Sequence, residues 1–490
     1  MKSENLSALL AGMKYKVLSG NVNTVVTGVA ESAALLKKGE VFICVKGYSK
    51  DGHDFAAQAM KNGAAAVIVE RPVTAHGKAA IILVKDSKKA MQEITHRFYA
   101  EAKKRVKIYG ITGTKGKTTV SYITEALLKE KTGKECAVIG TIGFKIGRKV
   151  YPAENTTPSN IKIHRLIAEA AGKGIKHVVI EASSHALDQG RLANIMFDSA
   201  AMTNVTRDHF DYHKNFKNYL KAKLRIVTEN LKKGGMLAVN TDSKGASEFI
   251  KEGKKKKAKI TTYSWKGKTD LSLKFYDIDI KGMDFELADY GKKTVFHSSL
   301  VGEHNIYNVM AALALTRGEV DLKTAAKAVH KFKTVKGRLE KVYSGAFTVL
   351  VDFAHTPDSL EKILFALNEL KKARIITVFG AGGDRDRGKR PLMAGAANRL
   401  SDFVVVTSDN PRTEKPADII KEVMAGITDK SRTIAIEDRT EAIRFAVKAA
   451  KKDDIILLAG KGHEEYQIIG DRKIPFSDKS AALKAIKDLR

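Results

Sequence analysis

V-K-I-Y-G-I-T-G-T-K-G-K-T-T-V, residues 106–120, is the stretch of sequence that decides the fold. An apolar, β-rich run over residues 106–111 ends at a glycine-rich turn, and a helical pattern then begins at Thr118 and reaches Lys131. A strand, a glycine-rich loop and a helix in this order are typical of a phosphate-binding loop, because the start of a helix attracts anions. The sequence therefore predicts a nucleotide-binding α/β domain built around this stretch.

The loop carries the residue types that a nucleoside triphosphate requires. Gly113 and Gly116 lack side chains, so backbone N–H groups can close around phosphate oxygens. Lys117 can reach the outer phosphates, and Thr118 can offer its hydroxyl to Mg²⁺. The spacing is shorter than the usual G-x4-G-K-[ST], because Gly110 lies one residue too far back for it. The alternative interpretation is a glycine-rich turn that only connects a strand to a helix.

Length and composition indicate a folded protein of several domains. The 490 residues exceed what one core usually organises, and 43% hydrophobic with 29% charged residues suit a globular chain. We predict an α/β protein of three domains. They are a small N-terminal α/β domain over residues 1–104, a central P-loop ATPase domain with a parallel sheet over 105–335, and a C-terminal Rossmann-like, doubly wound domain over 336–490.

Cysteine usage and hydropathy argue against several protein classes. Cys44 and Cys136 lie in apolar, strand-like runs and form no ligand cluster, so neither a disulfide scaffold nor a zinc site is indicated. The first thirty residues do not resemble an export signal, and no stretch has the length and hydropathy of a membrane span. We expect a cytoplasmic protein.

The net charge of +31 raises the possibility of a nucleic-acid partner, because counterion release favours basic surfaces. The lysines are spread over the whole length, however, and the densest run, Lys254–Lys257, has no aromatic neighbours. Such a run is typical of a solvated loop. Dispersed charge can also raise encounter rates with small polyanionic substrates. We therefore predict no nucleic-acid partner and keep a nucleic-acid-stimulated ATPase as a distant alternative.

The N-terminal pattern alternates short apolar runs with helical stretches. A polar loop, Lys46–Asp54, directly follows one of the expected strands. In α/β sheets ligands bind at the carboxyl ends of strands, so this loop is a candidate site, the alternative being an ordinary connection. The expected strands are 25–29, 41–45, 65–69 and 80–84, and the expected helices are 55–62 and 88–100.

The central pattern adds two candidate metal-binding features. An apolar strand over 177–181 ends in Glu181, the position at which a phosphate-loop domain places an acid near Mg²⁺. Asp208, His209, Asp211 and His213 then crowd a single loop. A structural cluster is the usual explanation, but the phosphate loop already calls for a divalent metal. The next helix, 215–230, carries four cations that the pattern cannot tell apart: Lys217, Lys221, Lys223 and Arg225.

The last third of the chain predicts a second parallel sheet. Each of four polar loops falls just after an expected strand, so the loops should share one edge of the sheet and form a cleft for anionic ligands. The expected strands are 347–353, 374–379, 403–407, 433–436 and 455–458, and the loops are Asp352–Pro357, Gly380–Arg390, Ser408–Arg412 and Gly460–Glu464.

Taken together, these motifs resemble the Mur ligases of peptidoglycan synthesis, and among them the UDP-N-acetylmuramoyl-tripeptide synthetases. The resemblance covers nearly the whole chain. Two departures are Lys115, where the family usually has Asn, and Ala182, where Val is common; neither removes a group that the chemistry needs. The landmarks are residues 113–119, Asn155–Pro158, Glu181–Leu187, Asp208–His213, Gly337–Glu340, Asp352–Pro357, Gly383–Arg390 and Asp409–Arg412.

The resemblance implies an ATP-dependent amide ligase that acts on UDP-MurNAc-L-Ala-D-Glu through an acyl phosphate. Arg412 implies meso-diaminopimelate as the added amino acid, because a guanidinium can form two parallel hydrogen bonds with the distal carboxylate, which L-lysine lacks. L-Lysine and meso-lanthionine stay open as alternatives, and a folylpolyglutamate synthetase is a more distant one. A monomer without membrane insertion is expected.

The resemblance also implies roles for individual residues. Those implied in catalysis are Lys117, Glu181, His209 and Lys223, and those implied as Mg²⁺ ligands are Thr118, Glu181, His209 and Lys223 as its carbamate. ATP is assigned to Gly113, Thr114, Lys115, Gly116, Lys117, Thr118, Thr119 and Asn305, with Arg338, Asp352 and His355 reaching it on domain closure. The uridine nucleotide is assigned to Ser32 and the loop from Gly47 to His53, and the muramoyl-dipeptide to Asn155, Thr156, Thr157, Ser183, Gln189 and Arg191. The amino acid is assigned to Arg385, Asp409, Asn410, Pro411, Arg412, Gly460 and Glu464.

Overall fold

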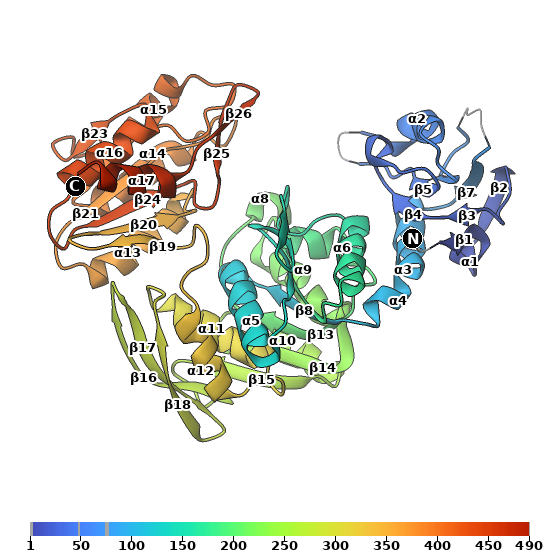
Figure 1. Ribbon diagram of the computed structural model, residues 1–490, viewed down its shortest axis with the longest axis horizontal. Helices are drawn as coiled ribbons and strands as arrows, with labels where there is room; N and C mark the ends of the chain where they lie inside the picture. Colours follow the sequence, from blue (N-terminus) through green and yellow to red (C-terminus); the bar gives the residue numbers. More distant parts are fainter. Residues whose placement is uncertain (1–2, 48–49, 74–77, 490) are drawn as a thin grey trace. The chain divides into compact units, whose positions relative to one another are not determined.

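The computed structural model describes residues 3–47, 50–73 and 78–489 (Figure 1). The chain divides into two compact units, which are described separately here. Unit 1 contains Met1–Lys117, Lys131–Thr262 and Ala314–Arg317, and unit 2 contains Thr118–Glu130, Tyr263–Leu313 and Gly318–Arg490. The domain boundaries predicted at 104/105 and 335/336 are not tested by this division and stay predictions. In the described part of the chain, no helix is long and apolar enough to cross a membrane.

The first sheet of unit 1 is small and mostly parallel. Its strand order is β2-β7-β6-β5-β4, with β2 antiparallel to β7 at one edge. Asp86 caps α3 by accepting a hydrogen bond from the Lys89 amide. The strands are β2 (Tyr15–Ser19), β4 (Gly28–Ala30), β5 (Glu40–Ile43), β6 (Ala66–Val69) and β7 (Ala80–Val84), with a separate pair β1 (Glu4–Asn5) and β3 (Val25–Val26). The helices are α1 (Leu6–Leu10), η1 (Ala33–Leu35), η2 (Gly52–Phe55), α2 (Ala56–Lys61), α3 (Ser87–Phe98) and α4 (Ala100–Lys103).

The second sheet of unit 1 is built around β8, the strand that was predicted before the phosphate loop. Its strand order begins β11-β10-β9-β12-β8-β13-β14-β15, and β9, β12, β8, β13 and β14 run parallel. The strands are β8 (Lys107–Thr112), β9 (Ala137–Gly140), β10 (Gly143–Ile146), β11 (Lys149–Tyr151), β12 (His177–Glu181), β13 (Phe197–Met202), β14 (Leu231–Asn240) and β15 (Lys259–Ser264). The helices are α6 (Asn160–Gly172), α7 (Ser184–Asp188), α8 (Phe210–His213), α9 (Phe216–Thr228) and α10 (Ala246–Lys255).

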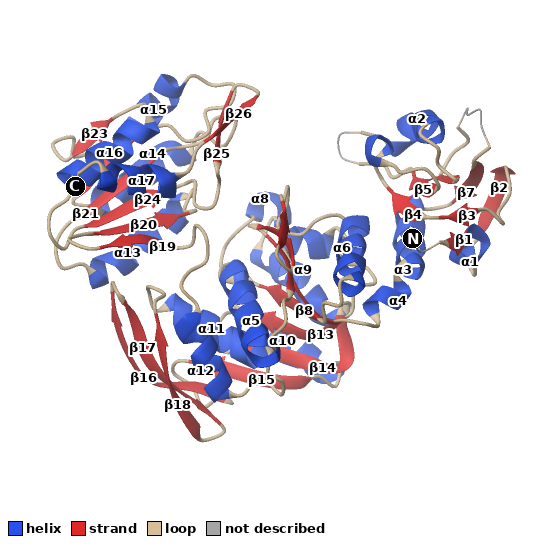
Figure 2. Cartoon of the chain, in the orientation of Figure 1, coloured by secondary structure: helices blue, strands red, loops and turns tan. Residues whose placement is uncertain are grey.

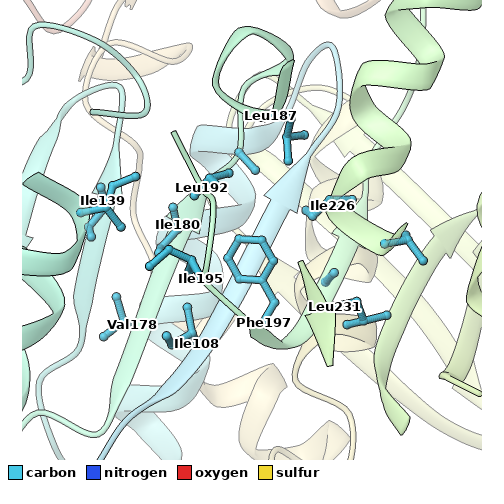
Figure 3. Packing of buried hydrophobic residues seen from close by; sticks show 14 of the residues in the cluster. Ile108, Ile139, Val178, Ile180, Leu187, Leu192, Ile195, Phe197, Ile226 and Leu231 are labelled. Atoms are coloured by element: carbon cyan, nitrogen blue, oxygen red, sulfur yellow. The ribbon is translucent and has the colours of Figure 1, made fainter. Parts of the chain in front are cut away.

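An apolar core packs between this sheet and its helices. Ile108, Ile180 and Phe197 lie in it from three neighbouring strands, and Figure 3 shows their side chains converging with residues of the surrounding helices and loops. Gly110, which the sequence analysis could not fit to the phosphate loop, has a packing role instead: a Cβ there would lie 2.6 Å from the Phe197 ring. The carboxyl ends of β8 and β12 share one edge, because Glu181 pairs with Ile111 in register.

Unit 2 contains the predicted doubly wound sheet. Its order is β19-β20-β24-β21-β22-β23, and every pairing except that of β19 with β20 is parallel (Figure 2). The four predicted polar loops therefore do leave one edge of the sheet. The strands are β19 (Glu340–Ser344), β20 (Thr348–Asp352), β21 (Ile375–Phe379), β22 (Phe403–Val406), β23 (Thr433–Ala435) and β24 (Ile455–Ala459), and the helices are α13 (Pro357–Leu370), α14 (Lys389–Leu400), α15 (Pro416–Met424), α16 (Arg439–Ala449) and α17 (Asp478–Lys487).

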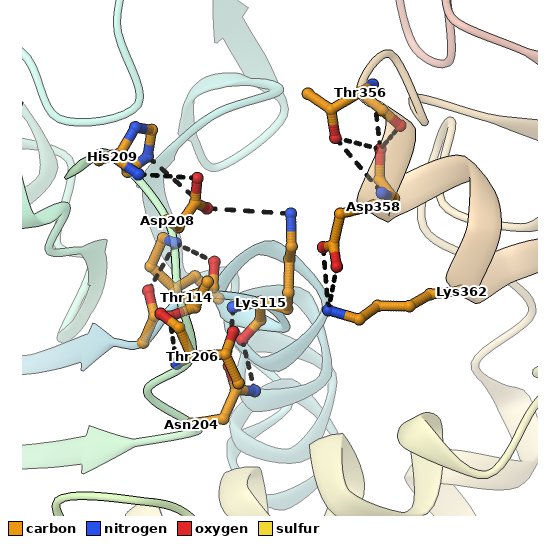
Figure 4. Close-up of polar contacts among 12 residues, drawn as sticks. Thr114, Lys115, Asn204, Thr206, Asp208, His209, Thr356, Asp358 and Lys362 are labelled. Atoms are coloured by element: carbon orange, nitrogen blue, oxygen red, sulfur yellow. Dashed lines mark hydrogen bonds and ion pairs between the residues drawn. The ribbon is translucent and has the colours of Figure 1, made fainter. Parts of the chain in front are cut away.

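Three further features complete unit 2. Antiparallel strands lie between residues 271 and 298, and a hairpin that the sequence pattern did not predict follows the last parallel strand. The capping box at Thr356 and Ser359 fixes the start of α13 (Figure 4). The antiparallel strands are β16 (Leu271–Asp279), β17 (Gly282–Asp289) and β18 (Lys292–Ser298), and the hairpin is β25 (Tyr466–Ile469) with β26 (Arg472–Pro475). The remaining helices are α5 (Lys117–Thr132), α11 (His304–Leu315) and α12 (Leu322–Lys331).

Candidate active site

The predicted phosphate loop lies at the carboxyl end of β8, and its glycines are needed there. At Gly113 a Cβ would overlap the hydroxyl of Thr203, and Gly116 has a φ of +86°, which disfavours residues with a side chain. Helix α5 begins directly at Lys117, and Thr118 is buried in its first turn. The strand, loop and helix predicted from residues 106–120 are thus confirmed.

The segment that follows β13 holds this loop in place. The Thr114 amide donates to the Asn204 carbonyl at 2.8 Å, and the Lys115 amide donates to Asn204 Oδ1 at 2.9 Å. Figure 4 shows Asn204 and Thr206 beside the loop, with the Lys115 ammonium extended toward Asp208 at 3.9 Å. Asn204 therefore anchors the loop, and the sequence analysis did not find it because no local pattern links it to Lys115.

Two lysines converge on one carbonyl oxygen of the loop. Lys117 Nζ donates to Gly113 O at 2.8 Å and to Thr114 O at 3.0 Å, and Lys223 Nζ donates to the same Gly113 oxygen at 2.7 Å. Lys223 is fully buried, and its ammonium lies 4.4 Å from the centre of the Tyr219 ring. Burial, and next the nearby charge of Lys117, lower the pKa of Lys223 well below its ordinary value. Among the cations of α9, the structure singles out Lys223.

Glu181 presents a buried carboxylate at the same edge of the sheet. Thr141 donates to it twice, from its amide to Oε1 and from its hydroxyl to Oε2, each at 3.0 Å. A Cβ at Gly140 would overlap Oε1, so the carboxylate fits only beside a glycine. Gly140 and Thr141 therefore support Glu181, and both were missed because they lie forty residues upstream.

The dense run Asp208–His213 does not gather around one point. His209 is half-exposed and has a left-handed backbone, whereas His213 is buried with Nε2 3.0 Å from the Ser184 hydroxyl. Burial lowers the pKa of both imidazoles below the ordinary value. In the residues that the structure describes, no group of three or more His, Cys, Asp or Glu side chains is arranged to hold a metal. The four side chains of this loop therefore do not form such a group among themselves, and the role of His209 as a metal ligand stays a prediction.

Five of the six residues predicted for the muramoyl-dipeptide form a connected group next to Glu181. The Thr157 hydroxyl donates to Glu181 O at 2.5 Å and accepts from the Ser183 amide at 3.1 Å. Arg191 donates to Thr157 O at 2.9 Å and to Gln189 Oε1 at 2.9 Å. The remaining predicted residues are Thr156, whose hydroxyl lies 3.1 Å from that of Thr141, and Asn155, which is exposed.

The predicted uridine site is only partly described. Residues 48 and 49 of the loop between Gly47 and His53 lie outside the described residues. His53 is buried: Nδ1 lies 2.7 Å from Asp51 Oδ1, and Nε2 accepts from the Glu70 amide at 2.9 Å. Both ring nitrogens are therefore engaged within the protein. Ser32 is half-buried at the start of η1, where its side chain makes no capping bond.

In unit 2, three residues predicted for the nucleotide lie around the carboxyl end of β20. Asp352 Oδ2 accepts from the Leu339 amide at 2.7 Å, and His355 Nδ1 donates to Phe353 O at 2.8 Å. The Arg338 guanidinium lies 5.2 Å from the Phe353 ring centre, and its Nε is buried without a hydrogen bond. Asn305 is buried in α11 and donates to Val301 O at 2.8 Å, so its side chain fixes the helix start.

The residues predicted for the amino acid lie on the loops after β21, β22 and β24. Arg412 Nη1 donates to Gly383 O at 2.7 Å, and its left-handed backbone (φ +53°) is held by the Arg412 amide bond to Ile468 O at 3.0 Å. Asn410 donates to Glu464 Oε2 at 2.8 Å. The fully buried Lys461 joins these loops and was missed, because Lys in a glycine-rich loop carries no pattern of its own. Arg385 is exposed, and its side chain donates to Asp384 O at 3.3 Å.

Comparison with known proteins covers nearly the whole chain. The family model described as Mur ligase family, catalytic domain, matches residues 26–99, that of the Mur ligase middle domain 111–316, and that of the Mur ligase glutamate ligase domain 337–462. The UDP-N-acetylmuramoyl-L-alanyl-D-glutamate--2,6-diaminopimelate ligase of Geobacillus thermodenitrificans is 42% identical over 460 residues, 92% of this chain and 93% of that protein. The enzyme of the same name from Aquifex aeolicus is 41% identical, with 92% of each chain covered.

Solved structures agree with this relationship. A structure titled UDP-N-acetylmuramoyl-L-alanyl-D-glutamate--2,6-diaminopimelate ligase superposes with a TM-score of 0.73 at 33% identity, covering 100% of this chain and 99% of that one. MurF of Thermotoga maritima, solved with ADP, has a TM-score of 0.64 at 20% identity and covers 94% of this chain and 97% of its own. That second likeness concerns the fold alone. This chain belongs to the Mur ligase family.

Proposed function

We propose that this chain is the ATP-dependent ligase that adds meso-2,6-diaminopimelate to UDP-N-acetylmuramoyl-L-alanyl-D-glutamate. The observation that carries the proposal is the convergence of Lys117 Nζ and Lys223 Nζ on Gly113 O, within a loop of the type that binds phosphate. The names of the relatives from Geobacillus and Aquifex supply the substrate class. Both kinds of support are independent of the net charge.

The proposed chemistry is mainly the management of negative charge. ATP, the D-glutamate carboxylate and the UDP diphosphate are all anionic, so the transferring phosphoryl group needs cations around it. Lys117 leaves its loop carbonyls and contacts the outer phosphates. Thr118, Glu181, His209 and Lys223 are the proposed ligands of Mg²⁺. The Thr118 hydroxyl and the Glu181 carboxylate offer the oxygen atoms that Mg²⁺ prefers, and the lowered pKa of His209 favours its neutral imidazole. When bound, Mg²⁺ would neutralise phosphate charge.

The surroundings of Lys223 suit the proposed carbamate better than they suit an ordinary, protonated lysine. Carbamate formation requires the neutral amine, whose nitrogen adds to the carbon of CO₂ while one proton is released. Burial keeps the pKa of Lys223 low and so favours that neutral form. The product carries a carboxylate, which places a negative charge next to the ammonium of Lys117. A mass increase on Lys223 under bicarbonate would test this directly.

The remaining site residues are proposed to bind the two organic substrates and the nucleotide. Arg412 and Glu464 contact the distal carboxylate and ammonium of diaminopimelate, with Arg385, Asp409, Asn410, Pro411 and Gly460 around them. Ser32 and the loop ending at His53 bind the uridine nucleotide, and the group from Asn155 to Arg191 binds the dipeptide. Asn305, Arg338, Asp352 and His355 contribute to ATP binding.

The experiment that tests the proposal is substrate-dependent ATP hydrolysis. ADP release by the purified chain should require both UDP-MurNAc-L-Ala-D-Glu and diaminopimelate, and the product should have the mass of the tripeptide nucleotide. A parallel series with DNA or RNA at increasing salt tests the rival ATPase. Stimulation by nucleic acid that falls steeply with salt, together with no response to the muropeptide, would refute the ligase.

A further inference from the structure

Lys461 is a buried cation inside the loops assigned to the amino acid. It lies directly after β24, between Gly460 and Glu464, and its side chain is 0% exposed. Lysine is almost never fully buried unless its charge is paired, because burial removes the hydration of the ammonium. The buried ammonium of Lys461 must therefore be paired with acceptors inside the protein.

Its ammonium has three acceptors, each on a residue of the proposed diaminopimelate pocket. Lys461 Nζ lies 3.0 Å from Asn410 Oδ1, 3.2 Å from Glu464 Oε2 and 3.3 Å from Asp409 Oδ1. An ammonium has three N–H donors, so the number of donors equals the number of acceptors around Lys461. Lys461 thus ties the loop after β22 to the loop after β24.

This arrangement fixes how Glu464 is presented. Its Oε2 accepts both from Lys461 and from Asn410 Nδ2, the latter at 2.8 Å. Within the described part of the chain, the hydrogen bonds to this side chain all end on Oε2, which leaves Oε1 as the oxygen for a ligand. A carboxylate with one oxygen held at two points has little freedom to rotate, so Oε1 keeps one direction.

The charges in the cluster also match one end of diaminopimelate. Asp409 and Glu464 carry two negative charges and Lys461 carries one positive charge, so one negative charge remains for a ligand ammonium. Arg412 supplies a positive charge to the same loop for a ligand carboxylate. The distal centre of diaminopimelate has an ammonium for the cluster and a carboxylate for Arg412. The side chain of L-lysine ends in an ammonium alone and pairs only with the cluster.

Arg439 holds the same two loops from behind. It donates to Ala459 O at 3.0 Å and to Ser408 O at 3.4 Å, the residues just before Gly460 and Asp409. Its charge is paired with Asp478 through bonds of 2.7 and 2.8 Å, and both side chains are fully buried. The backbone of the two loops is therefore fixed independently of Lys461, and Lys461 acts on their side chains.

We propose that Lys461 is a positioning residue that sets Asp409, Asn410 and Glu464 for the zwitterionic end of the diamino acid. The proposal rests on the proposed function and deepens it. Lys461 touches no substrate itself. Its removal should weaken the recognition of one substrate and leave the other two substrates unaffected.

The test compares Lys461→Met and Lys461→Gln in the full chain with the matched control Lys479→Met. Lys479 is half-exposed, and its ammonium bonds Glu340 of β19 at 2.9 Å. Lys461→Met should raise the KM for diaminopimelate at least tenfold and lower its preference over L-lysine, with the KM values for ATP and the UDP-dipeptide within twofold of wild type. Lys461→Gln keeps an N–H donor for the Asp409 and Glu464 carboxylates, which Lys461→Met lacks, so the Gln variant should fold readily and show a smaller increase in this KM. Lys479→Met should match wild type.

The outcomes separate this inference from the proposed function. Wild-type protein that fails to use diaminopimelate refutes the function itself. If wild type is active, a diaminopimelate KM within twofold of wild type in both Lys461 variants overturns the positioning role. Equal increases in all three KM values would also overturn it, because they would mean general destabilisation.

Discussion

At the scale of single residues, Lys117 gives the first test of the site. Its hydrogen bonds to Gly113 O and Thr114 O lie on the phosphate loop and not in the apolar core. We predict that Lys117→Ala lowers ligase activity by far more than tenfold and leaves the fold unchanged. A tenfold loss corresponds to an increase of about 1.4 kcal/mol in the activation barrier. ADP release measures the first effect and circular dichroism the second. Activity within tenfold of wild type would contradict the assignment.

Lys223 and Lys221 form a matched pair on α9. Lys223 is buried against the loop, whereas Lys221 is exposed two residues earlier on the same helix. We predict that Lys223→Ala is nearly inactive and Lys221→Ala is close to wild type, because only Lys223 can place a carbamate at the loop. Short carboxylic acids should restore part of the activity of Lys223→Ala. Equal losses in the two variants would indicate general electrostatics and remove the specific role.

Arg412 tests the specificity of the amino-acid pocket. Its described hydrogen bonds use Nη1, to Gly383 O and Asn410 O, so the rest of the guanidinium can face a carboxylate. We predict that Arg412→Ala loses most of the preference for diaminopimelate over L-lysine, measured as the ratio of kcat/KM values. Arg399→Ala, which removes an exposed cation paired with Glu361, is the control and should keep the preference.

At the scale of elements, Gly110 in β8 links the strand to the core. A Cβ there would lie 2.6 Å from the Phe197 ring, whereas at Gly172, the last residue of α6, a Cβ would meet nothing within 4 Å. We predict that Gly110→Ala lowers the free energy of unfolding by about 1–3 kcal/mol through overpacking. Gly172→Ala should leave it unchanged or raise it by up to about 1 kcal/mol. Denaturant titration of both variants checks the contrast.

The contact between Arg390 of α14 and Glu414, just before α15, should stabilise the fold less at acidic pH. The pKa of Glu414 is lowered to about 2, first by the hydrogen bond from the buried Arg390 side chain and next by the Asp384 amide. A folded pKa below the unfolded value of about 4.3 gives stability that is present above pH 4.3 and is lost as pH falls toward 2. Glu414→Gln should therefore be destabilised at pH 7, and its difference from wild type should shrink by pH 3. A difference in unfolding free energy between Glu414→Gln and wild type that stays constant from pH 7 to pH 3 would contradict this role of the Glu414 carboxylate.

At the scale of the whole molecule, the sequence predicts those features that local pattern encodes. The phosphate loop follows from glycine, lysine and threonine at fixed spacing, and the shared edge of the four loops in unit 2 follows from alternating strands and helices. Features that depend on distant segments were out of reach. The burial of Lys223, the support of Glu181 by Thr141, and the hairpin that holds Arg412 each join residues far apart in the chain.

The most direct measurement is a competition for the amino-acid substrate. Wild-type protein with ATP, Mg²⁺ and UDP-MurNAc-L-Ala-D-Glu is supplied with diaminopimelate and L-lysine together, and the product masses are compared. The account predicts a preference for diaminopimelate of at least about a hundredfold in kcat/KM, because L-lysine leaves the Arg412 guanidinium unpaired. Equal incorporation of L-lysine would contradict the assigned substrate, and the absence of either product would contradict the ligase itself.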